Sequence, residues 1–416
     1  MSFRIKAGLP ACFGVSLVLF LLVFVPGPGR ADGAGPELNA KSWAVIDARS
    51  GEPLASHRPR KRLPMASTTK LMTAWLAVRK LPLQKKVRAV DYKADPVESL
   101  MGLEAGQRIS VRDLLYGLMM VSGNDAAETL AVAASGSVER FVAQMNGAAR
   151  RMGLKDTHYE NPIGLDGKRH YTSAADLATL GRTVMRNPKL RPIVGARVAR
   201  LTSYSPPRVL ETSNSFLLTY DWAHGIKTGQ TMKAGYVLAS DGRRRATELV
   251  GAVIGAPTEL ARNEESARLL DYGFSLYTKE LPIRPRRPVV RVPVRFEDGT
   301  LALVSKTPVR VGTRADQELD VSVVAPDEVE GPIRKGQRLG RATVTLDGER
   351  IAAVPLLAAH AVEAPTTFDR LLAEPLLPIA VLVLVLCGIL AVVLFTRRRR
   401  TTRARQRLQR AVRKRP

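Results

Sequence analysis

Cysteine is almost absent from this sequence of 416 residues. The two that occur, Cys12 and Cys387, lie inside uncharged apolar runs, and no cysteine occurs between them. Disulfide bonds, thiolate metal sites and a cysteine nucleophile are therefore excluded for the long segment that separates the two runs. Because so few cysteines occur, they give no indication of the cellular compartment.

Two common catalytic signatures are also missing. The sequence has no His-Glu-x-x-His pattern, and its five histidines are scattered. It has no Gly-x-Ser-x-Gly pattern either, which disfavours a Ser-His-Asp hydrolase of the α/β type. We therefore expect neither a metal nor another cofactor.

Acidic residues are missing from both ends of the sequence. Residues 1–31 hold three basic residues and residues 397–416 hold eleven, with no acid in either segment. The total net charge of +26 therefore leaves +12 for the part between them. That moderate charge favours an anionic surface or substrate, but no nucleic-acid-binding motif accompanies it, so we expect no nucleic-acid partner.

The first 31 residues have the order of a secretory signal. Arg4 and Lys6 precede an apolar stretch at 7–25, which is followed by Pro-Gly-Pro-Gly and small residues. This order predicts a signal peptide over residues 1–31, with an uncleaved anchor as the alternative.

A second apolar run lies near the end of the sequence. Twenty residues without a charge, 376–395, match the thickness of a bilayer core. The basic residues that follow favour the cytoplasmic side. We therefore predict one transmembrane helix at 376–396, a cytoplasmic tail at 397–416 and a domain outside the cytoplasm. The tail also suits binding to anionic membrane lipid, and a buried soluble helix is the alternative to the span.

The segment 32–282 mixes strand and helix patterns. Strands are expected at 43–47 and just after Gly51, and a long, mainly helical zone follows. A hairpin of 235–240 and 248–254 is expected to turn at Asp241-Gly242. These patterns predict an α+β domain whose sheet combines strands from both ends of the segment.

Within the helical zone, a helix is expected at 126–134 behind an Asp125…Glu128 capping box. After Pro282 the pattern changes to short alternating runs separated by turn residues, which predicts a small all-β domain at 283–360. A linker at 361–375 would join it to the membrane helix.

Ser67 and Lys70 form a Ser-x-x-Lys pattern at the start of an apolar helix. Residues three apart share a helix face, so the amine can reach the hydroxyl. A serine is a weak nucleophile unless a base removes its proton, and lysine can be that base if burial and nearby positive charge keep it neutral. Alternatively, Ser67 only caps the helix and Lys70 faces solvent.

Two further short patterns follow. The first, Ser122-Gly123-Asn124, lies in the expected turn between two helices, where a hydroxyl and an amide can relay a proton and hold a substrate carbonyl. The second, Lys227-Thr228-Gly229, lies on an expected strand, where a lysine and a hydroxyl suit an anionic substrate end. Glycine would let the substrate backbone approach. Each pattern alone is also ordinary turn or edge-strand chemistry.

In this order, Ser-x-x-Lys, Ser-x-Asn and Lys-Thr-Gly are the set found in penicillin-binding proteins and class A β-lactamases. Residues 64–73 resemble the nucleophile region of the low-molecular-weight D-alanyl-D-alanine carboxypeptidases, and so do residues 161–177, 225–235 and 262–270. The resemblance spans about residues 38–280 and is looser for the β domain. It implies a β-lactamase/DD-peptidase-like α+β domain, an antiparallel sheet with helices, followed by a small all-β domain.

The resemblance also implies the activity. The enzyme would remove the terminal D-alanine from peptidoglycan stem peptides through an acyl-enzyme on Ser67, and β-lactam antibiotics would inhibit it. Lys70 would be the base, and Ser122 would pass the proton to the leaving D-alanine. The residues expected to bind substrate are Asn124, Lys227, Thr228, Gly229, Gln230 and Arg262.

Two of these assignments carry more detail. The backbone N–H groups of Ser67 and Gln230 would form the oxyanion hole. Thr228 and Arg262 would bind the terminal carboxylate. The alternative for Arg262 is a solvated arginine at the start of a helix. The family usually ends in an amphipathic helix on the membrane, whereas this sequence predicts a spanning helix.

Two other functions remain open. A class A β-lactamase is disfavoured because the second pattern is Ser-Gly-Asn and because no Glu-x-x-x-Asn segment follows before Lys227. A catalytically inactive scaffold that binds the cell wall is disfavoured by the intact serine and both lysines.

Overall fold

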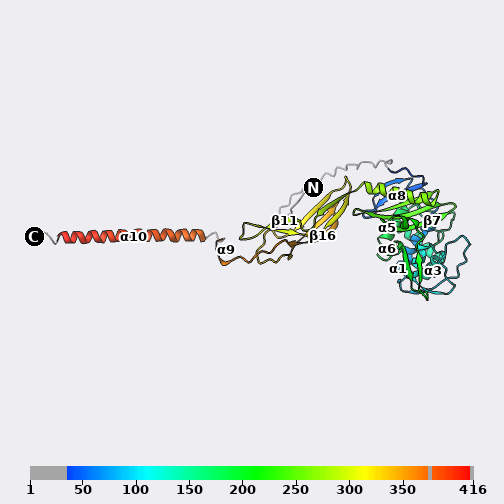
Figure 1. Ribbon diagram of the computed structural model, residues 1–416, viewed down its shortest axis with the longest axis horizontal. Helices are drawn as coiled ribbons and strands as arrows, with labels where there is room; N and C mark the ends of the chain where they lie inside the picture. Colours follow the sequence, from blue (N-terminus) through cyan, green and yellow to red (C-terminus); the bar gives the residue numbers. More distant parts are fainter. Residues whose placement is uncertain (1–34, 373–376, 413–416) are drawn as a thin grey trace, which may run out of the picture. The chain divides into compact units, whose positions relative to one another are not determined.

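The computed structural model describes residues 35–372 and 377–412, so the predicted signal peptide lies outside the described residues. Contacts divide the chain into two compact units. Among the described residues, one unit contains those up to Glu280 together with Val311–Asp316, and the other contains Leu281–Arg310 and those from Gln317 onward. Figure 1 colours both along the sequence.

The first unit is built on a five-stranded antiparallel sheet with the order β2-β1-β9-β8-β7. Strand β1 pairs with β9 along its whole length, which confirms the prediction of a sheet that combines strands from both ends of this segment. The strands are β1 (Ser42–Asp47), β2 (Pro53–His57), β7 (Ala223–Thr231), β8 (Gly235–Arg244) and β9 (Thr247–Ala256).

Both faces of this sheet are covered. Successive strand residues point to opposite faces, and on β1 Ala44 and Ile46 join one apolar cluster while Trp43 and Val45 join another. The first cluster contains residues of α5 and the second contains residues of α8. These helices are α5 (Ala174–Met185) and α8 (Glu259–Ser275).

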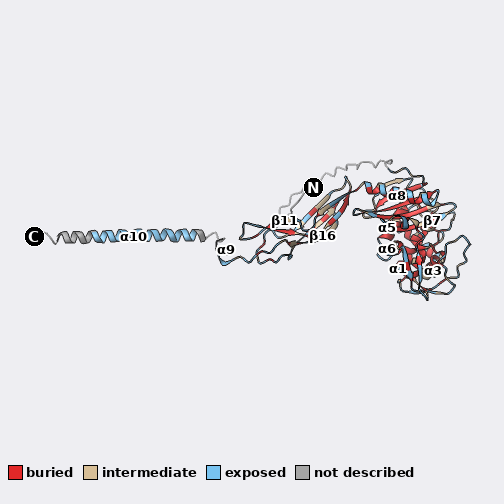
Figure 2. Ribbon diagram, in the orientation of Figure 1, coloured by how far each residue is buried: buried red, intermediate tan, exposed pale blue. Residues whose placement is uncertain are grey.

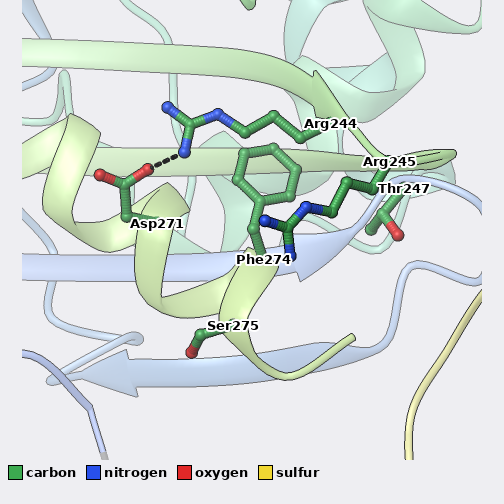
Figure 3. Close-up of a pocket in the computed structure, with 6 residues that line it drawn as sticks. All are labelled: Arg244, Arg245, Thr247, Asp271, Phe274 and Ser275. Carbon is green, nitrogen blue, oxygen red and sulfur yellow. Dashed lines mark hydrogen bonds and ion pairs between the residues drawn. The ribbon is translucent and has the colours of Figure 1, made fainter. Parts of the chain in front are cut away.

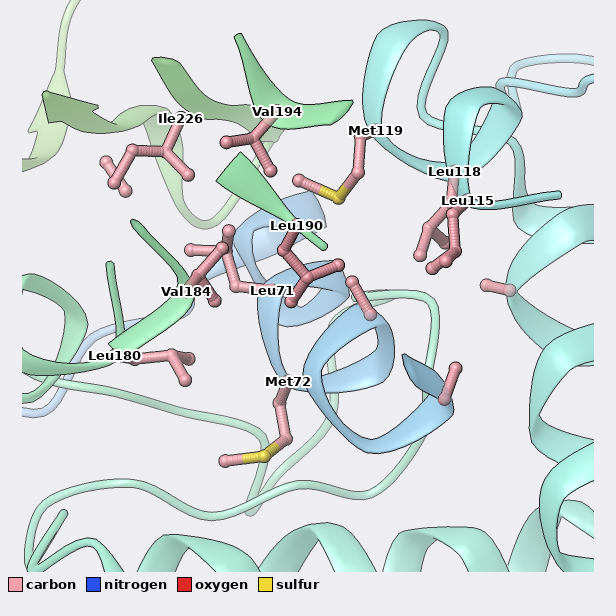
Figure 4. Close-up of a cluster of buried hydrophobic side chains, with 14 of the residues drawn as sticks. Leu71, Met72, Leu115, Leu118, Met119, Leu180, Val184, Leu190, Val194 and Ile226 are labelled. Carbon is pink, nitrogen blue, oxygen red and sulfur yellow. The ribbon is translucent and has the colours of Figure 1, made fainter. Parts of the chain in front are cut away.

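A group of helices completes the first apolar cluster. Leu71 and Met72, near the start of α1, are fully buried among side chains of α2 and α5 (Figure 4). This packing fixes the start of α1, directly after the short helix η1 that carries the predicted nucleophile. The helices are η1 (Ala66–Thr69), α1 (Lys70–Lys80), α2 (Val111–Met120), α3 (Asn124–Ser135), α4 (Val138–Arg151), α6 (Arg191–Val194) and α7 (Ser215–Thr219).

The first unit also contains two short antiparallel pairs that the sequence patterns did not predict. They are β3 (Lys86–Arg88) with β4 (Arg108–Ser110), and β5 (Val198–Leu201) with β6 (Arg208–Glu211). At three to four residues each, they are too short to give a readable alternation.

The predicted β8–β9 hairpin turn is wrong. Asp241 and Gly242 lie inside β8, and the strands continue to a turn at Arg245 and Ala246. Both turn residues have positive φ, 48° and 68°, which is the conformation of a tight two-residue hairpin. Neither position holds glycine or asparagine, so no residue type marks this turn in the sequence.

The predicted capping box before α3 is also wrong. The helix begins at Asn124 with Gly123 as its cap residue, and no side chain caps it. The Asp125 carboxylate instead accepts hydrogen bonds from the backbone N–H groups of Met101, Gly102 and Leu103, at 2.8–2.9 Å. Asp125 therefore ties the segment before α2 to the start of α3.

The second unit contains an antiparallel sheet with the order β11-β12-β16-β15-β14. Its strands are β11 (Pro288–Pro293), β12 (Thr300–Val304), β14 (Leu319–Val324), β15 (Arg338–Leu346) and β16 (Glu349–Ala358). Strands β10 (Thr278–Ile283) and β13 (Val309–Thr313), whose residues are divided between the two units, form a separate pair. The small all-β character predicted after Pro282 is confirmed.

Two helices follow this sheet, α9 (Thr367–Leu372) and α10 (Leu377–Val412). Within the described part of the chain, one stretch, Ile379–Arg403 of α10, is long and apolar enough to cross a membrane. Its apolar side chains are exposed, in contrast to the buried core of the first unit (Figure 2). An exposed apolar surface of this length needs a lipid or protein partner.

Candidate active site

Ser67 lies in the short helix η1, where two glycines pack against the backbone around it. A Cβ atom on Gly229 would lie 2.8 Å from the Ser67 nitrogen, and one on Gly164 would lie 2.2 Å from the Ala66 oxygen. Both distances are shorter than real contacts allow, so both positions need glycine. That Gly229 admits the substrate stays a prediction, and the structure adds that this glycine lets β7 approach the backbone of Ser67.

Lys70, the first residue of α1, is fully buried beside Ser67. Its Nζ lies 3.0 Å from Ser67 Oγ, 2.6 Å from Asn124 Oδ1 and 2.5 Å from the Ile163 carbonyl oxygen. A neutral amine has two N–H groups and one lone pair. The two carbonyl oxygens can only accept, so a neutral Lys70 donates to both of them and directs its lone pair at the serine hydroxyl.

The pKa of Lys70 is held well below its usual range. Burial is the main cause, and the positive charge of Lys227 adds to it. The carboxylates of Glu98 and Asp125 act in the opposite direction and raise the pKa. Burial and charge together therefore favour the neutral amine that a base requires.

Ser122 lies between α2 and α3 with φ of +60°, a conformation that is uncommon for residues other than glycine. Its side chain is buried, and its Oγ has no hydrogen-bond partner among the residues that the structure describes. A buried hydroxyl without a partner is costly, so stability alone does not explain this position. Asn124, predicted in the same turn, is the first residue of α3.

Lys227 is buried on β7, and its Nζ donates to the carbonyl oxygen of Thr228 at 2.9 Å. Burial, followed by the charge of Arg262, lowers its pKa from 10.5 to about 7. Near neutral pH this lysine therefore changes its charge easily, and an anionic ligand would favour its protonated form. On the same strand, Thr228 is partly buried and Gln230 is exposed.

Arg262, near the start of α8, is only 3% exposed, so it is not a solvated arginine. Its guanidinium donates to Asn263 Oδ1 at 2.9 Å, to Glu259 Oε1 at 3.0 Å and to Ser215 Oγ at 3.1 Å. These contacts position the guanidinium, and its positive charge acts on Lys227.

The structure adds residues that the sequence patterns missed. His170 Nδ1 accepts a hydrogen bond from the Glu160 backbone N–H at 3.0 Å, so its Nε2 carries the proton and donates to Thr69 Oγ1 at 2.8 Å. Thr69 Oγ1 in turn donates to the Ala66 carbonyl oxygen at 2.9 Å. Burial lowers the pKa of His170 to about 4, so a neutral imidazole braces the turn that carries the serine.

A pocket of about 230 Å³ lies elsewhere in this unit, at the β8–β9 turn (Figure 3). Arg244 and Asp271 form an ion pair at this pocket, and the Phe274 ring lies beside the Arg244 side chain in the view. Gly229, which contacts the serine turn, pairs with Val237, seven residues before Arg244. At about 3.3 Å per residue, the pocket is roughly 23 Å along the strand from the serine, so it is separate from this site.

A serine hydroxyl facing a buried lysine amine, with a second serine and a second buried lysine in the same unit, defines a class of serine acyl-transfer enzymes. Comparison with known sequences narrows this class. Residues 30–258 match the family described as D-alanyl-D-alanine carboxypeptidase, and residues 279–364 match the C-terminal domain of penicillin-binding protein 5. The chain therefore belongs to the D-alanyl-D-alanine carboxypeptidase family and is a serine peptidase.

Individual relatives agree over most of their length. D-alanyl-D-alanine carboxypeptidase DacF of Bacillus subtilis is 31% identical over 354 residues, which cover 82% of this chain and 91% of DacF. DacC of Escherichia coli is 30% identical over 374 residues, 84% of this chain and 92% of DacC. Such extended similarity favours neither a β-lactamase nor an inactive scaffold.

A solved structure is similar as well. Penicillin-binding protein 5 of Haemophilus influenzae is 28% identical, with a TM-score of 0.56, and the match covers 79% of this chain and 98% of that one. The expected fold, a DD-peptidase-like domain followed by a small β domain, is confirmed.

Proposed function

We propose that this enzyme removes the terminal D-alanine from peptidoglycan stem peptides through an acyl-enzyme on Ser67. The observation that carries this proposal is the buried Lys70 amine, whose Nζ lies 3.0 Å from Ser67 Oγ and within hydrogen-bond distance of two acceptor oxygens. Neither substrate binding nor acylation requires a metal or another cofactor in this scheme.

The reaction has two halves. Lys70 takes the hydroxyl proton while Ser67 Oγ bonds to the carbonyl carbon of the penultimate D-alanine. The C–N bond to the terminal D-alanine then breaks, and Ser122 passes a proton to the leaving nitrogen. Water hydrolyses the ester, which releases the shortened peptide and restores the hydroxyl. The backbone N–H groups of Ser67 and Gln230 would stabilise the oxyanion in both halves.

The substrate's terminal carboxylate would bind between β7 and α8. Lys227 and Arg262 supply positive charge, and the Thr228 hydroxyl supplies a directional hydrogen bond. Asn124 would hold the substrate amide. A β-lactam antibiotic offers a carbonyl and a carboxylate of the same kind, and it would acylate Ser67 in the same way.

The finer cellular placement is also a proposal. Residues 32–375 would lie outside the cytoplasm after removal of a signal peptide at 1–31, with a single span at 376–396. The basic tail at 397–416, with eleven basic residues and no acid, would contact anionic lipid on the cytoplasmic side.

The proposal is tested with two peptides that end in D-Ala-D-Ala, one with a free carboxylate and one amidated at its C-terminus. We expect the full-length enzyme to release D-alanine from the free acid and to cleave the amide at least tenfold more slowly, since a lost charged hydrogen bond is worth about 1.5–3 kcal/mol. The variant Ser67→Ala should cleave neither.

Thr228 provides the matched control. Thr228→Val, which removes the hydroxyl, should reduce the ratio between the cleavage rates of the free acid and the amide. Thr228→Ser, which keeps a hydroxyl, should retain the wild-type ratio. An enzyme that cleaves both peptides equally well does not recognise the carboxylate, and an active Ser67→Ala variant would contradict the acyl-enzyme.

A further inference from the structure

Glu98, which lies outside every pattern in the sequence, contacts the site through Asn124. Asn124 Nδ2 donates to Glu98 Oε2 at 2.6 Å, and the Tyr92 hydroxyl donates to the same oxygen. The backbone also holds this segment in place, because the Asn124 N–H donates to the Ser99 carbonyl oxygen at 2.8 Å. Glu98 is therefore fixed against the first turn of α3.

This contact determines which way the Asn124 amide faces. A side-chain amide has a donor end and an acceptor end, whereas a carboxylate can only accept. Although burial alone would raise the pKa of Glu98, hydrogen bonds from Tyr92 and Asn124 outweigh that effect and lower it. Glu98 is thus ionised near neutral pH, so the amide must turn its NH₂ group toward Glu98.

The other end of the amide then faces Lys70. Asn124 Oδ1 accepts from Lys70 Nζ at 2.6 Å, and this is one of the two acceptors that occupy the N–H groups of a neutral Lys70. If the amide were reversed, its NH₂ group would point at Lys70 and compete for the lone pair. We propose that Glu98 is a positioning residue: by orienting Asn124, it directs the Lys70 lone pair at Ser67.

Glu98 also acts on Lys70 through its charge, and the two effects are separable. Among the groups that face Lys70, Lys227 lowers its pKa while Glu98 and Asp125 raise it. The nearby His170 has a pKa of about 4 and is neutral across the working range. Removal of the Glu98 charge therefore shifts the deprotonation of Lys70 to lower pH, whereas loss of its acceptor disturbs the Asn124 amide.

Two substitutions separate these effects. Glu98→Gln removes the charge but keeps an oxygen that accepts from Asn124, while Glu98→Ala removes both. Glu104→Gln is the matched control, because Glu104 is an exposed carboxylate on the same segment. The measurement is the rate of Ser67 acylation by a fluorescent penicillin between pH 5 and 9 on the full-length protein, with thermal unfolding as a check on the fold.

We expect the acid limb of the profile to move to lower pH in both Glu98 variants. The maximal rate should fall by about tenfold to a hundredfold in Glu98→Ala and much less in Glu98→Gln, since a small displacement of a catalytic group has effects of this size. Equal maximal rates in the two variants and the control, or an acid limb that does not move, would overturn the inference.

This inference rests on the proposed acyl-enzyme, but the two fail differently. A wild-type protein that takes up no penicillin contradicts the proposed function. A wild-type protein that is acylated normally, together with a Glu98→Ala variant of unchanged rate, contradicts only the role of Glu98.

Discussion

Lys227 illustrates how a functional residue can weaken the fold that holds it. Its side chain is almost fully buried, and its amine donates a hydrogen bond to one backbone carbonyl oxygen among the described residues. Burial is the main reason that its pKa falls from 10.5 to about 7. A lysine with a lowered folded-state pKa binds protons more tightly in the unfolded state, so it destabilises the fold.

We expect Lys227→Met to raise the stability of the protein. The destabilisation is complete below the folded pKa of about 7 and disappears as the pH rises to the unfolded value near 10.5. At about 1.4 kcal/mol per pH unit, the advantage of the variant should reach a few kcal/mol at pH 6 and shrink steadily above pH 7. Urea unfolding between pH 6 and pH 10 measures this trend.

The exposed Lys233, two residues beyond β7, supplies the control. Lys233→Met should change stability by no more than about 0.5 kcal/mol, as expected for a surface position. A Lys227→Met variant that is less stable than the wild type at every pH would contradict this prediction. The packing of the lysine stem would then stabilise the fold by more than the buried charge destabilises it.

At the scale of single residues, the sequence identifies active-site residues mainly where they belong to short patterns. Ser67, Lys70 and Lys227 stand in such patterns, and the structure brings Lys70 within reach of Ser67. Glu98 and the Ile163 carbonyl could not be found in this way. Glu98 is one carboxylate in a charged loop, and a backbone carbonyl carries no signature in its side chain.

At the scale of elements, pairing was easier to predict than turns. The apolar runs of β1 and β9 indicated a shared sheet, and they do pair. Asp-Gly usually marks a turn, however, so the sequence predicts a turn at Asp241. Asp241 lies in the middle of β8, fully buried, and burial raises the pKa of its carboxyl well above the usual range. The tertiary contacts of β8 override the turn preference of Asp-Gly, so the sequence alone does not predict that Asp241 lies inside the strand.

The sequence also does not predict which elements approach each other closely. Gly164 and Gly229 are far apart in the sequence, yet a Cβ on either would collide with the backbone around Ser67. The Lys-Thr-Gly pattern indicated that a glycine was needed on β7, but not that the serine turn was the neighbour that required it. Such a contact joins two elements, so no single segment of sequence contains it.

At the scale of the whole molecule, helix α10 leads to a prediction about topology. We expect protease added to spheroplasts to digest the catalytic domain while a tag after residue 416 survives. The physical reason is the basic flank of the apolar stretch in α10, which favours the cytoplasmic side. Immunoblotting for the tag and for the catalytic domain reads both outcomes.

Permeabilised cells serve as the control, since the tag should then be digested as well. Loss of the tag in intact spheroplasts would place the basic tail outside and reverse the topology. Survival of both parts in intact spheroplasts would place the catalytic domain in the cytoplasm, where it could not reach the cell wall.

The role of Lys70 as the base for Ser67 is tested most directly by the acylation rate of Lys70→Arg. Arginine keeps a positive charge but does not give up its proton in this pH range. With a fluorescent penicillin, we expect the variant to be folded and to label Ser67 at least a hundredfold more slowly than the wild type, the lower range for loss of a general base. Labelling at a rate near that of the wild type would contradict a base at Lys70 and require another group to take the serine proton.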